Sequence, residues 1–242
     1  MSNQFSSESC DRWPRWWHLR IIKNTLVFLG LACLTVGGRA EPKSLEAVVE
    51  RANQALSQGK LDEAEKQTDA AQKLYSDKPE VLNLRGAILI KRGRFDQAAE
   101  QFARALQLDP AFYPAKYNLA QVLMLENKLD AAQTRFQELQ AVDPNSELLQ
   151  FKVVLCRVLE GQEDRSSGLI DAMRFPGETP AYYYARAAVL LKKGLEKDAH
   201  QYFANARKYY ADAQCAFFDQ ELKQVGLLTT VPKVSPTPGK NP

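Results

Sequence analysis

The sequence predicts an all-α solenoid of about five helix-turn-helix units followed by a capping helix. Three observations predict this fold. Residues that accept a left-handed backbone recur every 33 or 34 positions, a buried stripe with helical spacing follows each of them, and helix-forming residues fill the chain between. The pattern covers 45–212 and divides it into five units. Their bounds are 45–78, 79–112, 113–146, 147–179 and 180–212.

The turn residues set the period of the units. Gly59, Gly93, Asn127, Gly161 and Gly194 stand 34, 34, 34 and 33 residues apart, each between two amphipathic runs. Glycine and asparagine are the residues that most readily close a helix in the left-handed conformation. The spacing therefore indicates one pair of helices per unit.

Three further rows of residues define the buried face of each second helix. Five positions after each turn residue stands a small side chain, which lets two helices approach closely: Ala64, Ala98, Ala132, Ser166 and Ala199. The other two rows follow at i+4 and i+7: Thr68, Phe102, Phe136, Ile170 and Phe203, then Ala71, Ala105, Leu139, Met173 and Ala206. Such an i, i+4, i+7 stripe is typical of a helix with one buried face.

A 34-residue helix-turn-helix period with these residues resembles the tetratricopeptide repeat (TPR) family. Unit 79–112 carries the resemblance best, with Leu82, Arg85, Gly86, Ala98, Phe102, Ala105 and Pro110 at characteristic spacings. The resemblance implies a right-handed superhelix in which the first helix of each pair lines a concave groove. It also implies that this groove binds an extended or helical segment of another protein.

Two units depart from the family pattern. Unit 45–78 has Thr68 where the family has an aromatic residue, and unit 147–179 has Val154, Ser166 and Glu178 at three characteristic positions. The loop from Gly161 to Gly168 is expected to shorten or bend the second helix of the latter unit.

The chain after the repeats is expected to form a cap and a tail. Residues 213–226 read as one more amphipathic helix, which would cover the open apolar end of the stack. Residues 227–242 contain four prolines among Thr, Ser and Lys, so they are expected to be a disordered tail.

The first forty residues read as a secretory signal. A basic stretch precedes the apolar run 25–38, and Gly38 and Ala40 frame a cleavage position before Glu41. As a helix this run would span about 21 Å, less than the ~30 Å hydrocarbon layer. Cleavage after Ala40 and export to the periplasm or the medium are therefore expected.

Two alternatives to cleavage stay open. The segment could be retained as an inner-membrane anchor with Trp13, Trp16 and Trp17 at the membrane interface. Alternatively, Cys33 could be lipid-modified, although Gly30-Leu31-Ala32-Cys33 resembles a bacterial lipobox only loosely.

The charge distribution argues against a nucleic-acid partner. The chain has a formal charge of +3, and residues 1–40 account for all of it with five basic and two acidic residues. The remaining chain has 27 basic and 27 acidic residues, so it lacks the excess that phosphate binding requires.

The residues for catalysis are also sparse. Beyond residue 40 the chain keeps one histidine, His200, and two cysteines, Cys156 and Cys215, and it has no glycine-rich phosphate loop. The sequence therefore predicts no enzyme, no cofactor and no metal site, and it predicts buried single thiols.

The resemblance places candidate binding residues on the first helices. The groove residues expected to contact a partner are Asn53, Asn83, Tyr117, Asn118, Gln121, Phe151, Lys152 and Tyr184. The groove would be amide-lined and acidic at its N-terminal end and aromatic from Tyr117 onward. Asn118 and Lys152 match two of the four positions with which some TPR proteins clamp a terminal carboxylate, whereas Ala87 and Leu148 do not match.

The sequence leaves open whether the aromatic residues line an open groove or pack between repeats. If they line the groove, Tyr117→Ala and Tyr184→Ala should leave the melting temperature nearly unchanged. A core aromatic cut to alanine would instead cost about 3–5 kcal/mol.

The function expected from these features is that of an exported, non-enzymatic TPR adaptor that binds a segment of a partner protein, in the assembly of a cell-envelope complex. One alternative is a membrane-anchored or lipidated assembly factor, whose membrane contact would need the N-terminal segment to be retained. Another is a self-associating structural protein, with Phe217 and Phe218 in a two-fold interface between copies.

Overall fold

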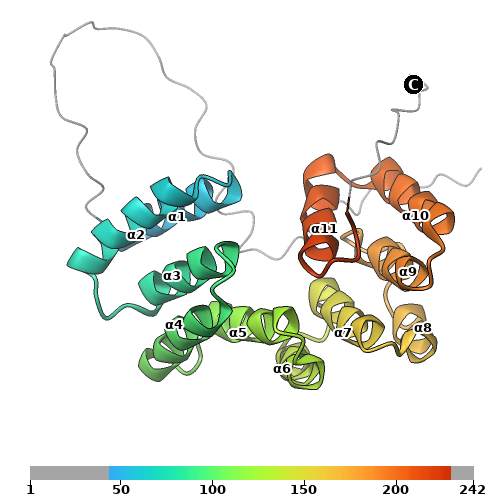
Figure 1. Ribbon diagram of the computed structural model, residues 1–242, viewed down its shortest axis with the longest axis horizontal. Helices are drawn as coiled ribbons and strands as arrows, with labels where there is room; N and C mark the ends of the chain where they lie inside the picture. Colours follow the sequence, from blue (N-terminus) through green and yellow to red (C-terminus); the bar gives the residue numbers. More distant parts are fainter. Residues whose placement is uncertain (1–43, 230–242) are drawn as a thin grey trace, which may run out of the picture. The chain divides into compact units, whose positions relative to one another are not determined.

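The computed structural model describes residues 44–229, and this range contains eleven α-helices joined by short turns (Figure 1). The described residues belong to one compact unit. The expected signal segment 1–40, with Cys33, and the tail from 230 lie outside the described residues. The helices are α1 (Leu45–Ser57), α2 (Leu61–Leu74), α3 (Pro79–Lys91), α4 (Phe95–Leu108), α5 (Tyr113–Leu125), α6 (Leu129–Val142), α7 (Glu147–Leu159), α8 (Glu163–Asp171), α9 (Ala181–Lys192), α10 (Glu196–Tyr209) and α11 (Asp212–Gln224).

The turns within the helix pairs have the predicted left-handed conformation. The five turn residues have φ angles of 72°, 71°, 60°, 77° and 75° in chain order, the third belonging to Asn127. Asn127 is the one residue other than glycine with a positive φ in the range 44–229. Each of these turns lets the second helix fold back against the first.

The core lies between the helices of each pair and between neighbouring pairs. All residues of the three predicted rows are buried, and all but Met173, which lies two residues beyond the end of α8, are on the second helices. The largest apolar cluster extends from Ala120 in α5 to Leu228 beyond α11, and three smaller clusters hold α1 to α5 together. Because Leu228 is buried in this cluster, the folded chain continues past the expected start of the tail at residue 227.

The contact between Gly86 in α3 and the Phe102 ring in α4 gives a first testable prediction. A Cβ added at Gly86 would lie 2.6 Å from the ring atom Cζ, whereas one added at Gly168 in α8 would meet no atom within 4 Å. Gly86→Ala is therefore expected to lower the free energy of unfolding by about 1–3 kcal/mol through overpacking. Gly168→Ala should leave it unchanged or raise it by up to about 1 kcal/mol. Urea denaturation measures both, and equal effects would contradict the packing shown here.

The fourth pair departs from the others, as the sequence indicates, but at a different place. Helix α8 has 9 residues, whereas α2, α4, α6 and α10 each have 14. The expectation of a shortened helix is confirmed. The expected loop over 161–168 is wrong, because residues 163–168 are helical and the missing turns are at the C-terminal end of α8.

An acidic side chain of α7 holds the segment that replaces the end of α8. Glu147 is buried, and its carboxylate accepts hydrogen bonds from the backbone N–H of Glu178 at 2.7 Å and of Thr179 at 2.8 Å. The hydroxyl of Thr179 donates to the same carboxylate. Gly177 packs so closely against the Glu147 carboxylate that a Cβ there would require this carboxylate to move. These bonds give the irregular segment one defined path into α9.

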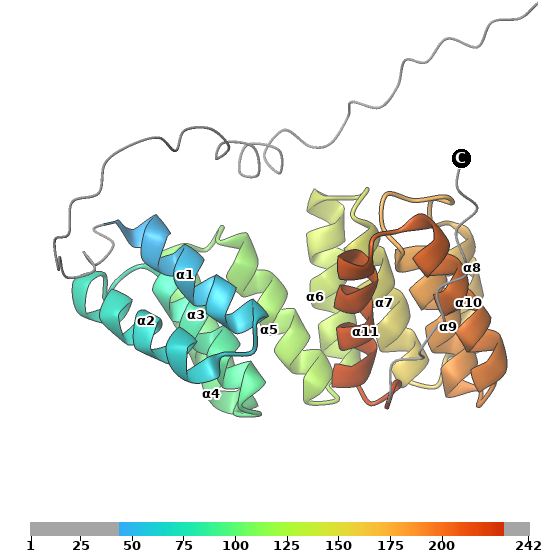
Figure 2. The same ribbon diagram turned by 90° about the horizontal axis from the view of Figure 1, so that it is seen from above.

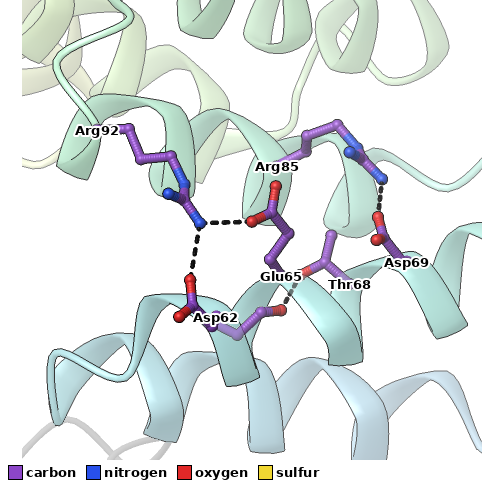
Figure 3. Close-up of polar contacts among 7 residues, drawn as sticks. Asp62, Glu65, Thr68, Asp69, Arg85 and Arg92 are labelled. Atoms are coloured by element: carbon purple, nitrogen blue, oxygen red, sulfur yellow. Dashed lines mark hydrogen bonds and ion pairs between the residues drawn. The ribbon is translucent and has the colours of Figure 1, made fainter.

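Ion pairs connect α2 to α3 on the surface of the first two repeats (Figure 3). Arg85 pairs with Asp69 at 2.6 Å, and Arg92 contacts Asp62 at 3.1 Å and Glu65 at 2.5 Å. The exposed fractions of the five side chains range from 32 % to 98 %, so each pair stabilises the fold by only about 0–1 kcal/mol. Helix pairing at this end therefore depends mainly on the buried rows.

Candidate protein-binding face

The predicted groove residues lie on the first helices of the pairs, and those nearest the N-terminus are accessible. Asn53 in α1 is exposed, and Asn83 in α3 is half-buried. The side-chain amide of Asn118 in α5 donates a hydrogen bond of 2.9 Å to Asn83 Oδ1. Amide side chains therefore lie at the accessible N-terminal part of this face, and their role in binding a partner stays a prediction. We call the surface formed by α1, α3, α5, α7 and α9 the first-helix face.

Helix α11 covers the C-terminal part of the first-helix face, where it lies alongside α7 and α9 (Figure 1, Figure 2). Phe151, Lys152 and Tyr184 are completely buried beneath it, and Gln121 is 7 % exposed. The expectation that these four residues line an open groove is therefore wrong. The resemblance places them on the correct face, but the last helix of the chain already occupies it.

Aromatic and aliphatic side chains anchor α11. The Phe218 ring packs edge-on against the Phe151 ring, with centroids 5.1 Å apart, and lies 5.4 Å from the ring of Tyr184. Leu222, one helical turn further on, is also fully buried. Phe218 is 3 % exposed and Phe217 45 %. A two-fold interface between copies that uses both phenylalanines is therefore wrong for Phe218, whose ring is inside its own chain.

A buried charge pair joins α11 to α7. Lys152 Nζ forms an ion pair with the carboxylate of Glu221 and donates a hydrogen bond of 2.7 Å to Gln121 Oε1. The same ammonium lies 5.7 Å from the Tyr117 ring centroid and 5.8 Å from that of Phe136, within cation–π range. Lys152 thus binds a carboxylate, as its position in the family pattern suggests, and that carboxylate is a side chain of α11.

A second charge pair joins α11 to α9 and α10. Arg207 contacts Asp219 at 2.6 Å, and the hydroxyl of Tyr184 donates to the other oxygen of Asp219 at 2.8 Å. Burial, and then the hydrogen bond to Asp219, raise the pKa of Tyr184 well above the ordinary value for tyrosine. The phenol therefore stays protonated and acts as a fixed hydrogen-bond donor to α11.

At the C-terminal end of α11, one side-chain hydrogen bond forms with α5, and one buried hydroxyl of α5 stays without a partner. Gln121 of α5 donates a hydrogen bond of 2.8 Å to Gln224, the last residue of α11. Nearby, the hydroxyl of Tyr117 is buried and has no hydrogen-bond partner. Burial raises the pKa of Tyr117, and the negative charge of Glu221 raises it further. The Tyr117 hydroxyl is therefore a buried donor that the described residues leave unpaired.

The sequence reading missed the acidic and amide residues of this site. Asp219, Glu221 and Gln224 of α11 bind Tyr184, Lys152 and Gln121, and none of the three was among the predicted groove residues. Arg207 of α10, which pairs with Asp219, was not predicted either. A signal was present, because Glu221 follows Phe218 by three residues and Asp219 precedes Leu222 by three, so both acids border the apolar stripe of the helix. Acids at such positions need buried partners.

Both cysteines of the described range are free and buried, as predicted. Burial raises the pKa of Cys156 from 9.0 to about 12. At pH 8 its thiolate fraction in the folded protein is then about a thousand-fold below that of an unshifted thiol. We expect labelling of Cys156 by DTNB to be correspondingly slow until urea unfolds the chain, as followed by mass spectrometry of its peptide. Prompt labelling of the folded protein would show that α7 is not packed as described.

Other parts of the described structure offer little chemistry. No group of three or more His, Cys, Asp or Glu side chains within 44–229 is placed to hold a metal ion. A surface hollow of about 260 Å³ lies over α2, α3 and α4 and is lined by Arg85, Ile88, Arg94, Gln101 and neighbouring side chains. Within the same range, no helix is both long and apolar enough to cross a bilayer.

Comparison with known proteins agrees with this architecture. Models of the tetratricopeptide repeat match residues 49–111 and 89–152. A tetratricopeptide repeat protein of Parabacteroides merdae is 18 % identical, with a TM-score of 0.61 over 76 % of this chain and 71 % of its own. TTC0263, a TPR protein of Thermus thermophilus, is 18 % identical, with a TM-score of 0.61 over 74 % of this chain and all of its own.

A third solved structure, PilW, is described as a widely conserved type IV pilus biogenesis factor. It is 19 % identical, with a TM-score of 0.57 over 74 % of this chain and 84 % of its own. Stacked helix pairs with a regular period and a face built from alternate helices define a helical-repeat solenoid. Residues 49–152 thus match the tetratricopeptide repeat, and the described chain has the TPR fold, with about five repeats in a right-handed superhelix and α11 as its last helix.

Proposed function

We propose that this protein is an exported, non-enzymatic adaptor that binds a segment of a partner protein on its first-helix face. The packing of α11 on α7 and α9 carries the proposal, because it shows that this face can bind an amphipathic helix. There one amphipathic helix is held by two apolar side chains, two ion pairs and a hydrogen bond between two side-chain amides. A face with these contacts is suited to recognising protein segments, and TPR proteins are generally scaffolds of this kind.

The uncovered part of the face offers a surface for a partner. Val49 and Asn53 in α1 and Asn83 in α3 are at least partly exposed, and α11 contacts the face only from α5 onward. Side-chain amides both donate and accept, so they can bind the backbone of an extended or helical segment. A partner could therefore use the α1 to α3 part of the face while α11 stays in place.

Export and a role in envelope assembly are supported by the sequence of residues 1–40 and fit the fold that PilW shares. A membrane-anchored or lipidated assembly factor is the alternative. Intact mass spectrometry of the protein isolated from its native source separates the two. A chain that starts at Glu41 supports export with cleavage, whereas a retained segment or a lipid on Cys33 supports anchoring.

Site-specific photocrosslinking tests partner binding on the face. We expect a photoreactive residue at Asn53 to give a crosslinked protein partner in cells. The same group at Glu138, which is exposed on the second helix α6, should not give it. Crosslinking of the same partner at both positions, or at neither, would argue against binding on the first-helix face.

A further inference from the structure

The position of α11 at the end of the folded chain sets it apart from the other helices. Each of α2 to α10 is joined at both ends to another helix, whereas the described chain after α11 runs only to residue 229. α11 is therefore joined to the other described helices by one short connection at Tyr210 and Ala211, and its release from the first-helix face would also release Leu228 from the core. Its contacts with the face then resemble those of a bound peptide.

The charges beneath α11 define what kind of helix fits. Lys152 and Arg207 are cations that face the helix, and Asp219 and Glu221 are the acids that meet them. Removing one partner of a buried pair leaves an unpaired charge, so the face discriminates strongly against a neutral or basic helix. The apolar contacts add a spacing requirement, because Phe218 and Leu222 enter the face one helical turn apart.

The fit of α11 leaves room for a better ligand. The hydroxyl of Tyr117 is buried without a hydrogen-bond partner, and the ring that carries it lies 5.7 Å from Lys152 Nζ. A helix that carries an acceptor at this point gains a hydrogen bond that α11 does not make, and such a bond favours it over α11.

We propose that α11 occupies a binding site for a helix of a partner protein. In this proposal the α5, α7 and α9 part of the first-helix face, together with Arg207 of the adjoining α10, binds an acidic amphipathic helix of another protein. That helix has the pattern aromatic–Asp–x–Glu–Leu seen at 218–222, and it displaces α11. The inference rests on the proposed function and names the partner chemistry for the covered part of the same face. A partner bound only at Asn53 and Asn83 would satisfy the proposed function and not this inference.

Tethering determines how the test must be designed. Because α11 is attached to the chain, it competes at an effective concentration on the order of millimolar. A peptide added to the unaltered protein should therefore bind weakly. A variant that weakens α11 and leaves the face intact should bind the same peptide more tightly.

The probe is a fluorescein-labelled synthetic peptide with the sequence of 211–228, titrated against the full chain by fluorescence anisotropy. For Phe218→Asp we expect Kd to fall at least about ten-fold relative to the unaltered protein, because its own α11 competes less. Phe217→Asp is the matched control, because the Phe217 ring is 45 % exposed, and this variant should behave like the unaltered protein. A peptide with Asp219→Asn and Glu221→Gln should bind at least about ten-fold more weakly, because it leaves two cations unpaired.

The results that would overturn the proposal are equally defined. Failure of the peptide to bind a Phe218→Asp chain that keeps its helical circular dichroism would show that α11 is a permanent structural element. Equal binding of the acidic and the neutral peptide would show that the face does not select charge. In both cases crosslinking from Asn53 could still succeed, so the proposed function would be judged separately.

A second variant covers the case in which Phe218→Asp does not fold. A protease site inserted between Tyr210 and Ala211 allows α11 to be cut free after the native chain has folded. Exchange of the cut helix for the labelled peptide supports the proposal, and a cut helix that never exchanges overturns it. Light scattering completes the test, since a dimer formed by trading α11 between copies would assign the face to a second copy of this chain instead.

Discussion

Replacing Tyr184 by alanine is expected to lower the free energy of unfolding by about 3–5 kcal/mol. The ring is fully buried between Phe203 and Phe218, with centroids 5.1 Å and 5.4 Å away, so its removal leaves a cavity in the largest apolar cluster. The change also leaves Asp219 without one of its two partners. Urea denaturation followed by circular dichroism measures the loss.

Two companion variants identify the source of this effect. Tyr209→Ala removes a ring that is 71 % exposed and should change stability by no more than about 0.5 kcal/mol. Tyr184→Phe keeps the ring and removes the hydroxyl, so it should cost about 1–3 kcal/mol for the unsatisfied Asp219 oxygen. A Tyr184→Ala variant as stable as Tyr209→Ala would mean that the ring lines an open groove after all.

Replacing Glu221 by glutamine is expected to cost about 3–5 kcal/mol, because it leaves the Lys152 ammonium buried without a counter-charge. The loss cannot exceed the free energy that holds α11 on the face. Beyond that point the helix leaves and Lys152 is exposed to water. An unfolding curve with an early, small transition for α11 would show this limit directly.

A variant of a surface ion pair and a double variant of the buried pair serve as controls for Glu221→Gln. Arg135 and Glu138 form a pair at 3.0 Å with both side chains 56 % exposed, so Glu138→Gln should cost no more than about 0.5 kcal/mol. Replacing Lys152 by Met and Glu221 by Leu together removes both charges and should restore most of the stability. If Glu221→Gln proves as harmless as Glu138→Gln, Lys152 is not buried under α11.

The repeat architecture could be predicted because each unit encodes it locally. Gly59 and Asn127 close their turns through their own backbone preferences, and Ala98 and Phe102 bury the same helix face within a single unit. The same signals recur in every unit, so one irregular unit does not obscure the period. The end of α8 could not be predicted in this way. Its path is set by Glu147, which binds backbone groups 31 and 32 residues away.

The position of α11 could not be predicted, because it depends on pairs of residues that are far apart in the sequence. Lys152 and Glu221 are separated by 69 residues, and Gln121 and Gln224 by 103. The resemblance located the face but contained no information on which segment covers it. Acids such as Asp219 on an expected capping helix also read naturally as solvated, and only the folded chain shows Arg207 and Tyr184 around it.

Hydrogen exchange on the full chain, with and without a saturating amount of the acidic peptide, tests the central claim most directly. The account predicts that the peptide speeds exchange in α11, at 212–224, while 147–159 and 181–192 stay protected, because the displaced helix loses its packing and the face keeps an occupant. Unchanged exchange in α11 at saturating peptide would contradict the claim that α11 and a partner helix bind the same site.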